Sequence, residues 1–402
     1  MKILYIDVNC KNSSTGQIVY SLFSECKKNG CESALAYGRG PKISELNIFK
    51  FGLDFETYFH AFMTRITGYT GYFSFFSTKR LLSFIKHFKP DIVHIHELHA
   101  YFVNLKPLLK YLKDNRIHTI FTNHCEFLFT GKCGLSKECT KYSANCGKCP
   151  LKKSYPSSLL FDHTKKMIED KRKLLTGWED AYFVSPSEWL NSKMDISFLN
   201  ESKRFVINNG IDTSIYKVNL DIGIKSNFGI PNNKKIVMSV APNIFSENKG
   251  GHRFLEIAKK MTSHDNIVFV AVGATEIPNE IPSNVIVLPL IKDKGVLTNL
   301  YSIADCFVIC SRFDNFPTTC LEAQCCGTKI VGYDVGGVKE TILDGHGVVV
   351  PFNDSDSASK EIINIIENDY SKEDISMKSK SYFSQERMFG EYLTLYKKML
   401  CD

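Results

Sequence analysis

The stretch Ser311-Arg-Phe-Asp-Asn-Phe-Pro-Thr-Thr-Cys-Leu-Glu-Ala-Gln-Cys-Cys-Gly327 is the most informative part of the sequence, because it has the pattern of a corner between a strand and a helix. Pro317 is favoured in the first turn of a helix and Gly327 just past the last turn, so we expect a short helix between them. Asp314 then lies in the turn before the helix, and Glu322 lies about one turn inside it. Strand–turn–helix units of this kind build parallel α/β sheets.

The predicted helix start is suited to bind an anion. Backbone N–H groups in the first turn of a helix lack partners within the helix and point at a ligand placed there. We therefore expect Phe316, Pro317, Thr318 and Thr319 to line a phosphate site, with Glu322 beside it. Acids that flank a phosphate site suit a ligand with both phosphates and hydroxyls, namely a nucleotide sugar. An ordinary capped corner is the alternative for the two acids alone.

Short apolar runs alternate with longer amphipathic ones along the whole chain, which favours parallel α/β sheets. The expected strands fall into two groups: 3–8, 91–95, 118–122, 182–185 and 204–207, then 235–240, 267–272, 285–288, 306–310, 329–332 and 347–350. We expect two facing Rossmann-like domains with a deep cleft between them, since ligands bind at the carboxyl ends of parallel strands. The expected parts are an N-terminal acceptor-side domain, a C-terminal donor domain and a last helix that returns to the first domain, at residues 1–210, 211–380 and 381–402.

Composition limits the function classes. The 402 residues are too many for one ordinary core, and 44% hydrophobic content supports burial. The net charge of +7 fits an anionic substrate or an acidic membrane surface. No nucleic-acid signature is present, the amino terminus has the pattern of a strand rather than a signal peptide, and no apolar run is long enough to span a membrane. We expect a cytoplasmic protein whose fourteen cysteines stay thiols.

Several motifs, taken together, resemble glycosyltransferase family 4. The donor-site signature of that family is similar to Asp314-Asn-Phe-Pro317, Leu321-Glu-Ala323, Cys326-Gly-Thr328 and Tyr333-Asp-Val-Gly-Gly337. Three other motifs resemble those of the family and occur in the same order: Ser14-Thr-Gly16 after the first strand, Asn208-Asn-Gly-Ile-Asp212 at the entry to the second domain, and Lys249-Gly250 at the phosphate-binding lysine. Thr130-Gly-Lys-Cys133, Cys149-Pro150 and Tyr155-Pro-Ser157 resemble a subgroup assigned to capsule or colanic-acid-type polysaccharide synthesis. The resemblance implies the GT-B fold and a retaining nucleotide-sugar transferase.

The resemblance also implies roles at matching positions. Glu322 would accept hydrogen bonds from the donor ribose, Asp314 would bind the transferred sugar or hold the diphosphate end, and Lys249 would neutralise diphosphate charge. His124 would lie beside the reacting sugar. The chain departs from the family in having the shorter Asp314 where Glu is usual. It also has Asn243 where many members carry an arginine, for which Arg253 and Arg312 are the candidate replacements.

Physical chemistry supports two of these positions independently. Lys249 precedes a predicted helix, where its ammonium adds to the positive end of the helix dipole, although most lysines are simply solvated. Gly16 lies in the polar loop after the first strand and lets the backbone approach a ligand closely. That loop lacks the glycine pattern of dinucleotide sites, so NAD is disfavoured.

Histidines and acids follow two strands of the first domain. His124 ends a strand at the expected cleft and could donate a hydrogen bond to a sugar hydroxyl, or simply be packed. For His94, packing is the expected role. Glu97 and Glu126 could face the same cleft and bind the acceptor.

Two metal patterns lead to different expectations. Asp354-Ser-Asp356 mimics a metal-binding pair but stands where an Asp caps a helix, so we expect catalysis without a metal cofactor. A cysteine-rich insertion near 125–157 has the spacing of a structural zinc site, with Cys133, Cys139, Cys146 and Cys149 as ligands. Disulfides and plain thiols are the alternatives.

The stretch 58–89 is rich in aromatic residues and in cations. Packed helices that cover the first domain are the expected structure. The alternative is a basic amphipathic segment in peripheral contact with the inner membrane surface.

The sequence as a whole predicts a retaining hexosyltransferase. The donor would be a nucleoside diphosphate sugar and the acceptor a saccharide, which the resemblance implies is attached to a lipid. Alternatives are a nucleotide-sugar epimerase of the same fold and a non-catalytic sugar-nucleotide-binding protein. An epimerase would alter the sugar nucleotide when incubated with it alone.

Overall fold

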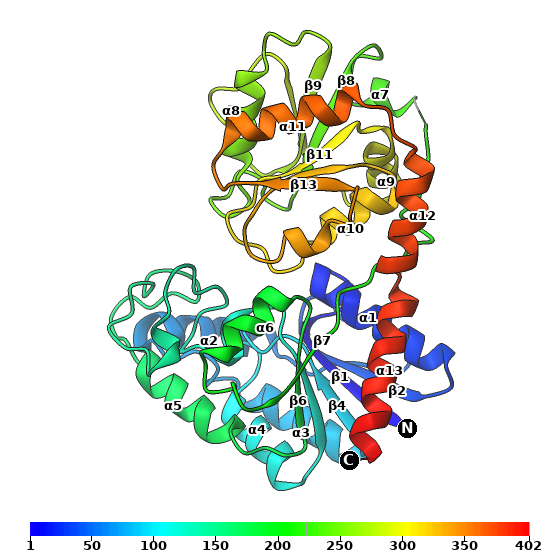
Figure 1. Ribbon diagram of the computed structural model, residues 1–402. Helices are drawn as coiled ribbons and strands as arrows, with labels where there is room; N and C mark the ends of the chain where they lie inside the picture. Colours follow the sequence, from blue (N-terminus) through cyan, green and yellow to red (C-terminus); the bar gives the residue numbers. More distant parts are fainter. Residues whose placement is uncertain (222, 402) are drawn as a thin grey trace. The chain divides into compact units, whose positions relative to one another are not determined.

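The computed structural model describes residues 1–221 and 223–401, and the chain divides into two compact units (Figure 1). Unit 1 comprises Met1–Asn208 and the chain from Met388 on, and unit 2 comprises Asn209–Arg387. Each unit is built on one sheet whose strands all pair in parallel.

The sheet of unit 1 has seven strands in the order β3-β2-β1-β4-β5-β6-β7. The bounds are β1 Lys2–Asn9, β2 Glu32–Arg39, β3 Ile48–Lys50, β4 Ile92–Ile95, β5 His118–Thr122, β6 Ala181–Ser185 and β7 Lys203–Val206. The five strands expected in this sheet are present, and β2 and β3 are additions. Strand β2 was not predicted because its core, Ser-Ala-Leu-Ala, is poor in the β-branched residues that mark a strand.

Helices cover both faces of this sheet with separate apolar clusters. They are α1 Ser14–Lys28, α2 Asp54–Thr67, α3 Phe75–Phe88, α4 Leu105–Asp114, α5 Thr164–Leu175 and α6 Glu188–Asp195, with short turns η1 Glu126–Leu128 and η2 Lys141–Ser143. The last helix, α13 (Gln385–Cys401), buries Phe389, Tyr392, Tyr396 and Met399 in one apolar cluster with residues of β1 and α1.

Unit 2 has a six-stranded sheet in the order β10-β9-β8-β11-β12-β13. The strands are β8 Lys235–Val240, β9 Ile267–Ala274, β10 Val285–Pro289, β11 Cys306–Ile309, β12 Ile330–Tyr333 and β13 Gly347–Val350. The helices are α7 Ile224–Asn227, α8 Gly251–Lys260, α9 Lys294–Ile303, α10 Thr318–Cys325, α11 Ser355–Glu367 and α12 Lys372–Phe383, with the turn η3 Lys339–Thr341. All six strands were expected.

The corner from β11 to α10 has the predicted form with one shift. Pro317 is the N-cap of α10 rather than its first helical residue, so the first turn begins at Thr318. Gly327 has a φ of +81°, the left-handed conformation that commonly follows a helix end. Because β8, β11 and β12 are neighbours, the loops after their carboxyl ends meet at one edge of the sheet.

Within the described ranges, no helix is long and apolar enough to cross a membrane.

Candidate functional site

The loops after β8 and β11 are joined by hydrogen bonds. The backbone N–H of Arg312 donates to the carbonyl of Asn248 at 2.8 Å, and the Asn248 side chain donates to the carbonyl of Phe313 at 3.0 Å. Gly250 has a φ of +73°, and a Cβ there would lie 2.0 Å from the carbonyl oxygen of Cys310. Only glycine therefore allows the two loops to approach this closely.

This junction brings Lys249 and Asp314 together. The Lys249 Nζ lies 2.8 Å from Asp314 Oδ2, and the Ser311 hydroxyl donates to the same oxygen at 3.2 Å. The neighbouring carboxylate raises the pKa of Lys249, so the ammonium stays charged. Both side chains keep part of their surface exposed, at 31% and 18%, and a ligand can reach them.

The loop after β12 also packs against Asp314. The N–H of Gly337 donates to the Asp314 carbonyl at 3.0 Å, and a Cβ on Gly336 would lie 2.0 Å from that oxygen. Asp314 is thus held by its backbone and its side chain. The predicted Gly-Gly motif serves to support the acid of the neighbouring loop.

Glu322 lies in the second turn of α10. Its Oε2 accepts a hydrogen bond from the Tyr301 hydroxyl at 3.0 Å. Burial raises the pKa of Glu322. Tyr301, which comes from α9, was not predicted as part of the site, because it lies 21 positions before Glu322 in the sequence. The hydroxyl holds the carboxylate in place.

The first turn of α10 contributes backbone N–H groups, and the Thr318 side chain also bonds the Glu322 carboxylate. Thr318 and Thr319 are its first residues and are half-buried, so their N–H groups stand at the positive end of the helix dipole. Phe316 is buried in the apolar core of unit 2, where its ring anchors the corner. Its contribution to a ligand site would therefore come from its backbone.

The two arginines named as possible extra cations have other contacts. Arg253 donates to Asn353 Oδ1 at 2.6 Å, and Arg312 forms an ion pair with Glu247 at 3.2 Å. Asp354 caps α11 by accepting from the N–H of Ser357 at 2.9 Å, which confirms its predicted capping role.

Unit 1 has a second cluster of titratable groups, near the end of β1 and after β4 and β5. Asp7 is fully buried, and its Oδ1 accepts from the N–H of Glu97 at 3.2 Å. Burial and the nearby Glu97 carboxylate raise the pKa of Asp7 to about 7. His124 Nε2 lies 2.9 Å from His96 Nδ1, and burial lowers the pKa of His124. Asp7 was not predicted, because an acid inside an apolar strand has no local signal of function.

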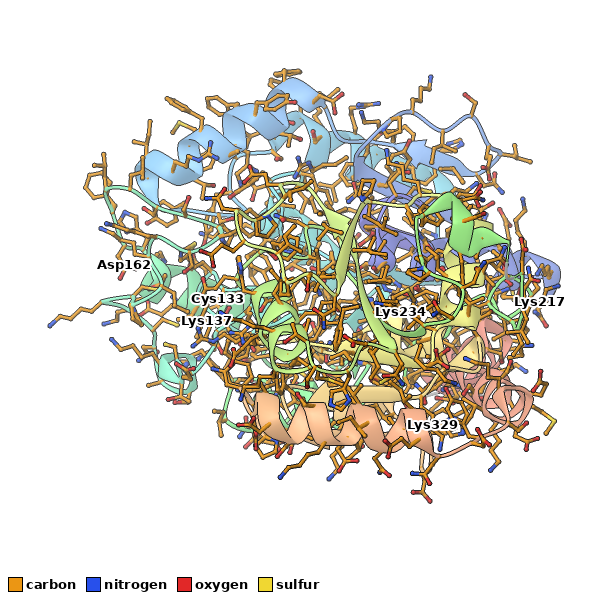
Figure 2. All side chains as sticks on the ribbon, turned by 90° about the horizontal axis from the view of Figure 1, so that it is seen from above. Cys133, Lys137, Asp162, Lys217, Lys234 and Lys329 are labelled. Carbon is orange, nitrogen blue, oxygen red and sulfur yellow. The ribbon has the colours of Figure 1, made fainter. Side chains whose placement is uncertain are left out.

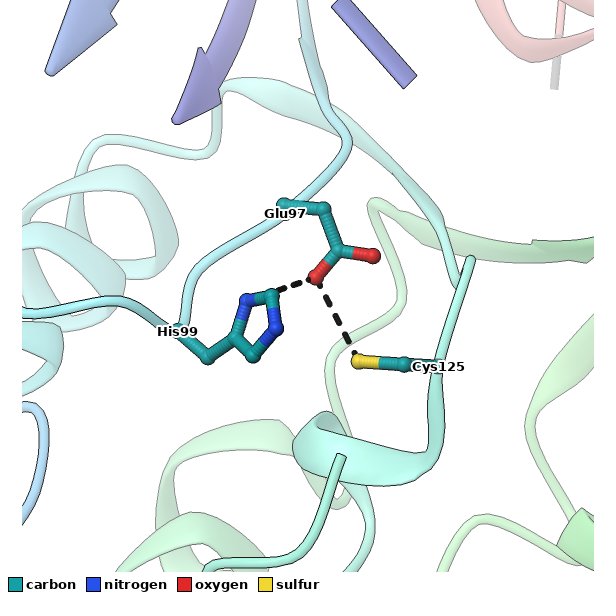
Figure 3. Close-up of side chains that lie close together, drawn as sticks. All are labelled: Glu97, His99 and Cys125. Atoms are coloured by element: carbon teal, nitrogen blue, oxygen red, sulfur yellow. Dashed lines mark hydrogen bonds and ion pairs between the residues drawn. The ribbon is translucent and has the colours of Figure 1, made fainter. Parts of the chain in front are cut away.

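The buried Glu97 forms a triad with the half-buried His99 and Cys125 (Figure 3). Glu97 Oε2 lies 2.9 Å from His99 Nδ1 and accepts from the Cys125 thiol at 3.3 Å. Burial acts to raise the pKa of Glu97, but the contacts with these two residues and His124 outweigh it and lower that pKa to about 2. The carboxylate is therefore ionised and already paired.

Other predicted residues of unit 1 have hydrogen-bond partners within the chain. His94 bonds Tyr396 and Thr122, each at 2.7 Å, which confirms its predicted packing role. Glu126 is buried and accepts from the N–H of Ser136 at 2.9 Å. Gly16 lies in the first turn of α1, where its N–H donates to the capping hydroxyl of Ser13 at 3.0 Å.

The four cysteines of the insertion line one cavity of about 20 Å³. Cys133 forms a hydrogen bond with Cys149, and this contact lowers the pKa of Cys149 to about 6. The N–H of Cys149 donates to Asp162 at 2.7 Å, and Figure 2 labels Asp162 and Cys133 on this part of the chain. The buried ammonium of Lys132 donates to the carbonyls of residues 152, 154 and 156, so one charge organises a segment with little regular structure.

Comparison with known families covers both units. The family model "Glycosyltransferase Family 4" matches residues 15–215, and "Glycosyl transferases group 1" matches residues 223–382. A curated relative, "Putative colanic acid biosynthesis glycosyl transferase WcaC" of Escherichia coli K12, is 24% identical over 330 residues, which are 77% of each chain.

Solved structures show the same fold at low identity. Sucrose-phosphate synthase from Thermosynechococcus elongatus matches with a TM-score of 0.71 at 14% identity, over 100% of this chain and 99% of that one. Anabaena Alr3699/HepE in complex with UDP-glucose matches with a TM-score of 0.65 at 13% identity, over 98% and 99%. The chain is a glycosyltransferase of the GT-B fold and belongs to glycosyltransferase family 4.

Proposed function

We propose that this glycosyltransferase is a retaining hexosyltransferase that uses a nucleoside diphosphate sugar. The observation that carries the proposal is the ion pair of Lys249 and Asp314, held beside the start of α10 by three loops of one sheet edge. The complex of Alr3699/HepE with UDP-glucose supports a sugar-nucleotide donor. In this proposal unit 2 binds the donor and unit 1 binds the acceptor.

The proposed chemistry depends on charge that develops as the glycosidic bond breaks. The departing nucleoside diphosphate becomes more negative, and the Lys249 ammonium and the N–H groups of Thr318 and Thr319 would stabilise it. Groups that are already oriented stabilise the transition state more than the ground state. Asp314 would hold the ammonium in place and contact the transferred sugar, while Glu322 would accept hydrogen bonds from the ribose.

Retention of configuration would follow from departure and attack on the same face of the sugar, assisted by the leaving phosphate. His124 would lie beside the reacting sugar. No metal cofactor is invoked, because the ammonium and the helix N–H groups supply the positive charge.

The acceptor is proposed to be a saccharide attached to a lipid, in the synthesis of a surface polysaccharide. The colanic acid assignment of the WcaC relative supports this. A lipid-linked acceptor would place the enzyme in the cytoplasm, in peripheral contact with the inner membrane surface.

A structural zinc ion is proposed for the four cysteines that line the 20 Å³ cavity. Four thiolates are a common closed zinc site, and a segment poor in core residues gains stability from one. Among the described residues, the one group of three or more ligand atoms within 4.8 Å of one another is that of Glu97, His99 and Cys125. No three of the four described cysteine sulfur atoms therefore lie this close together, and binding of zinc would require them to move closer together.

A screen of sugar nucleotides by thermal shift tests the donor, because a ligand that binds the folded chain raises its apparent stability. A shift with a nucleoside diphosphate hexose, lost in Lys249→Ala, is the expected result. Conversion of that donor to an epimer without acceptor would instead identify an isomerase.

A further inference from the structure

Helix α2 is amphipathic with its polar face turned inward. Its buried residues are Glu56, Thr57, His60 and Thr64. The Glu56 carboxylate accepts from the N–H groups of Phe76 and Ser77, both at 2.7 Å. These bonds attach the inner face of α2 to the start of α3.

His60 continues this polar contact. Its Nε2 accepts from the N–H of Gly71 at 2.9 Å, and its Nδ1 bonds the Ser74 hydroxyl at 2.7 Å. Burial lowers the pKa of His60 to about 3, so the ring is neutral. The buried polar side chains Glu56 and His60 therefore have hydrogen-bond partners, and these bonds hold the inner face of α2 against the domain.

The opposite face of α2 is aromatic and exposed. Phe55, Tyr58, Phe59 and Phe62 follow the spacing i, i+3, i+4, i+7 and form one stripe. Their exposed fractions are 64%, 75%, 47% and 57%. This arrangement is the reverse of an ordinary surface helix. The expected helices are present as α2 and α3, and Phe84 and Phe88 pack on the core of unit 1, but the aromatic residues of α2 stay exposed.

Hydrogen bonds from backbone N–H groups join two further segments with exposed apolar residues to α2. Phe75 and Phe76, at the start of α3, are exposed, and the N–H of Phe76 binds Glu56 on α2. At the other end of α2, the N–H of Leu159 donates to the Arg65 carbonyl at 2.8 Å, and the run Leu159-Leu-Phe161 is exposed. We call this set the aromatic surface; its members are Phe55, Tyr58, Phe59, Phe62, Phe75, Phe76, Leu159, Leu160 and Phe161.

The charged groups of the same segments favour an anionic partner. Arg65, Lys79 and Lys153 are exposed. Of the nearby acids, Asp54 pairs with Lys50 at 2.9 Å, Glu56 is buried, and Asp162 accepts from backbone N–H groups. Aromatic side chains among lysine and arginine are the pattern of a helix that lies in a bilayer interface.

We propose that the aromatic surface docks on the anionic face of a lipid bilayer. Clusters of exposed apolar side chains mark interaction sites in soluble proteins. Aromatic rings suit the headgroup region, where an apolar body meets a polar boundary. Two copies that met through this surface would bring like-charged residues together, which disfavours self-association. The inference names the surface for the membrane contact in the proposed function, but docking itself requires neither donor nor acceptor.

Vesicle flotation of the full chain, without donor or acceptor, tests the proposal. The probes are phosphatidylcholine vesicles and vesicles that also contain phosphatidylglycerol. The variant is Phe55→Ser, Tyr58→Ser, Phe62→Ser. The matched control is Ile277→Ser, Leu290→Ser, Met377→Ser, which changes three exposed apolar residues of unit 2. Circular dichroism checks that both variants fold.

The wild type and the control should float with the anionic vesicles, and the triple variant should bind them at least about a hundredfold more weakly. Added salt should weaken binding, because it screens the basic residues. The proposal is overturned if the wild type floats with neither vesicle, or if the triple variant floats as the wild type does. It is equally overturned if sedimentation shows that the aromatic surface instead joins two copies of the chain. Loss of transferase activity with flotation intact would affect the proposed function alone.

Discussion

Lys249 and Asp314 are separated by 65 positions in the sequence, yet the Lys249 Nζ lies 2.8 Å from Asp314 Oδ2. Two glycines make this possible, because Gly250 lets the first loop pass the end of β11 and Gly336 lets the third loop pass Asp314. The pair is partly exposed, so its charge remains available to a ligand.

Removal of the ammonium should reduce catalysis more than it reduces stability. We predict that Lys249→Ala lowers kcat/KM by about 10- to 150-fold, because a hydrogen bond to a charged group contributes about 1.5–3 kcal/mol. Steady-state kinetics with the donor found in the thermal-shift screen provides the measurement. Lys260→Ala is the matched control, since Lys260 forms an exposed ion pair with Asp356. Equal losses in the two variants would contradict the role of Lys249.

The buried Asp7 predicts a pH dependence of stability. Its pKa is about 7 in the folded chain, against 3.8 when exposed, so folding favours the protonated form. The stabilisation is complete below the exposed pKa and is lost as the pH rises through the folded pKa, by up to about 4 kcal/mol. Asp7→Asn should therefore stabilise unit 1 more at about pH 8 than at about pH 4.

Urea unfolding followed by tryptophan fluorescence measures this effect, because both tryptophans, Trp178 and Trp189, belong to unit 1. Glu201→Gln, an exposed acid of the same unit, is the control and should show no such difference. The account of Asp7 fails if Asp7→Asn destabilises unit 1 by the same amount at both pH values.

The cysteine cluster is predicted to hold a structural zinc ion, whereas the reaction is predicted to need no metal. Purified protein should contain about one zinc per chain by elemental analysis. The double variant Cys146→Ser, Cys149→Ser should lose that zinc and unfold at lower temperature. Cys401→Ser, an exposed cysteine outside the cavity, should retain it. Zinc at far less than one equivalent in the wild type would refute the site.

Brief treatment with EDTA should leave turnover unchanged, because no step of the proposed reaction uses a metal. Loss of turnover in the chelator, restored by manganese, would contradict this prediction. Circular dichroism in the same samples shows whether a loss instead reflects unfolding of the cysteine segment.

Local sequence patterns predicted most of the strands. Contacts between segments that are distant in the sequence are seen in the structure alone. Eleven expected strands are present because their apolar runs are bounded by turn residues, whereas β2 was missed because serine and alanine are weak strand formers. The aromatic stripe of α2 illustrates a second limit. A helical period shows that residues share a face, but it does not tell whether that face is turned inward. The hydrogen bonds of Glu56 and His60, which come from distant segments, determine its orientation.

The candidate site likewise contains residues that the local pattern predicted and residues that it could not predict. Pro317 and Gly327 predicted the corner and the helix start within one residue. Tyr301, which holds Glu322, and Asp7, which lies beside Glu97, could not be found from spacing, because each contact joins elements that are far apart in the sequence.

In the proposed function, unit 2 binds a sugar nucleotide through Lys249, Glu322 and the first turn of α10. Titration calorimetry of the donor against wild type, Glu322→Gln and the half-exposed control Glu361→Gln measures this binding. We predict that Glu322→Gln weakens donor binding by about tenfold or more, with Glu361→Gln unchanged. Equal donor affinity in all three proteins would contradict the account.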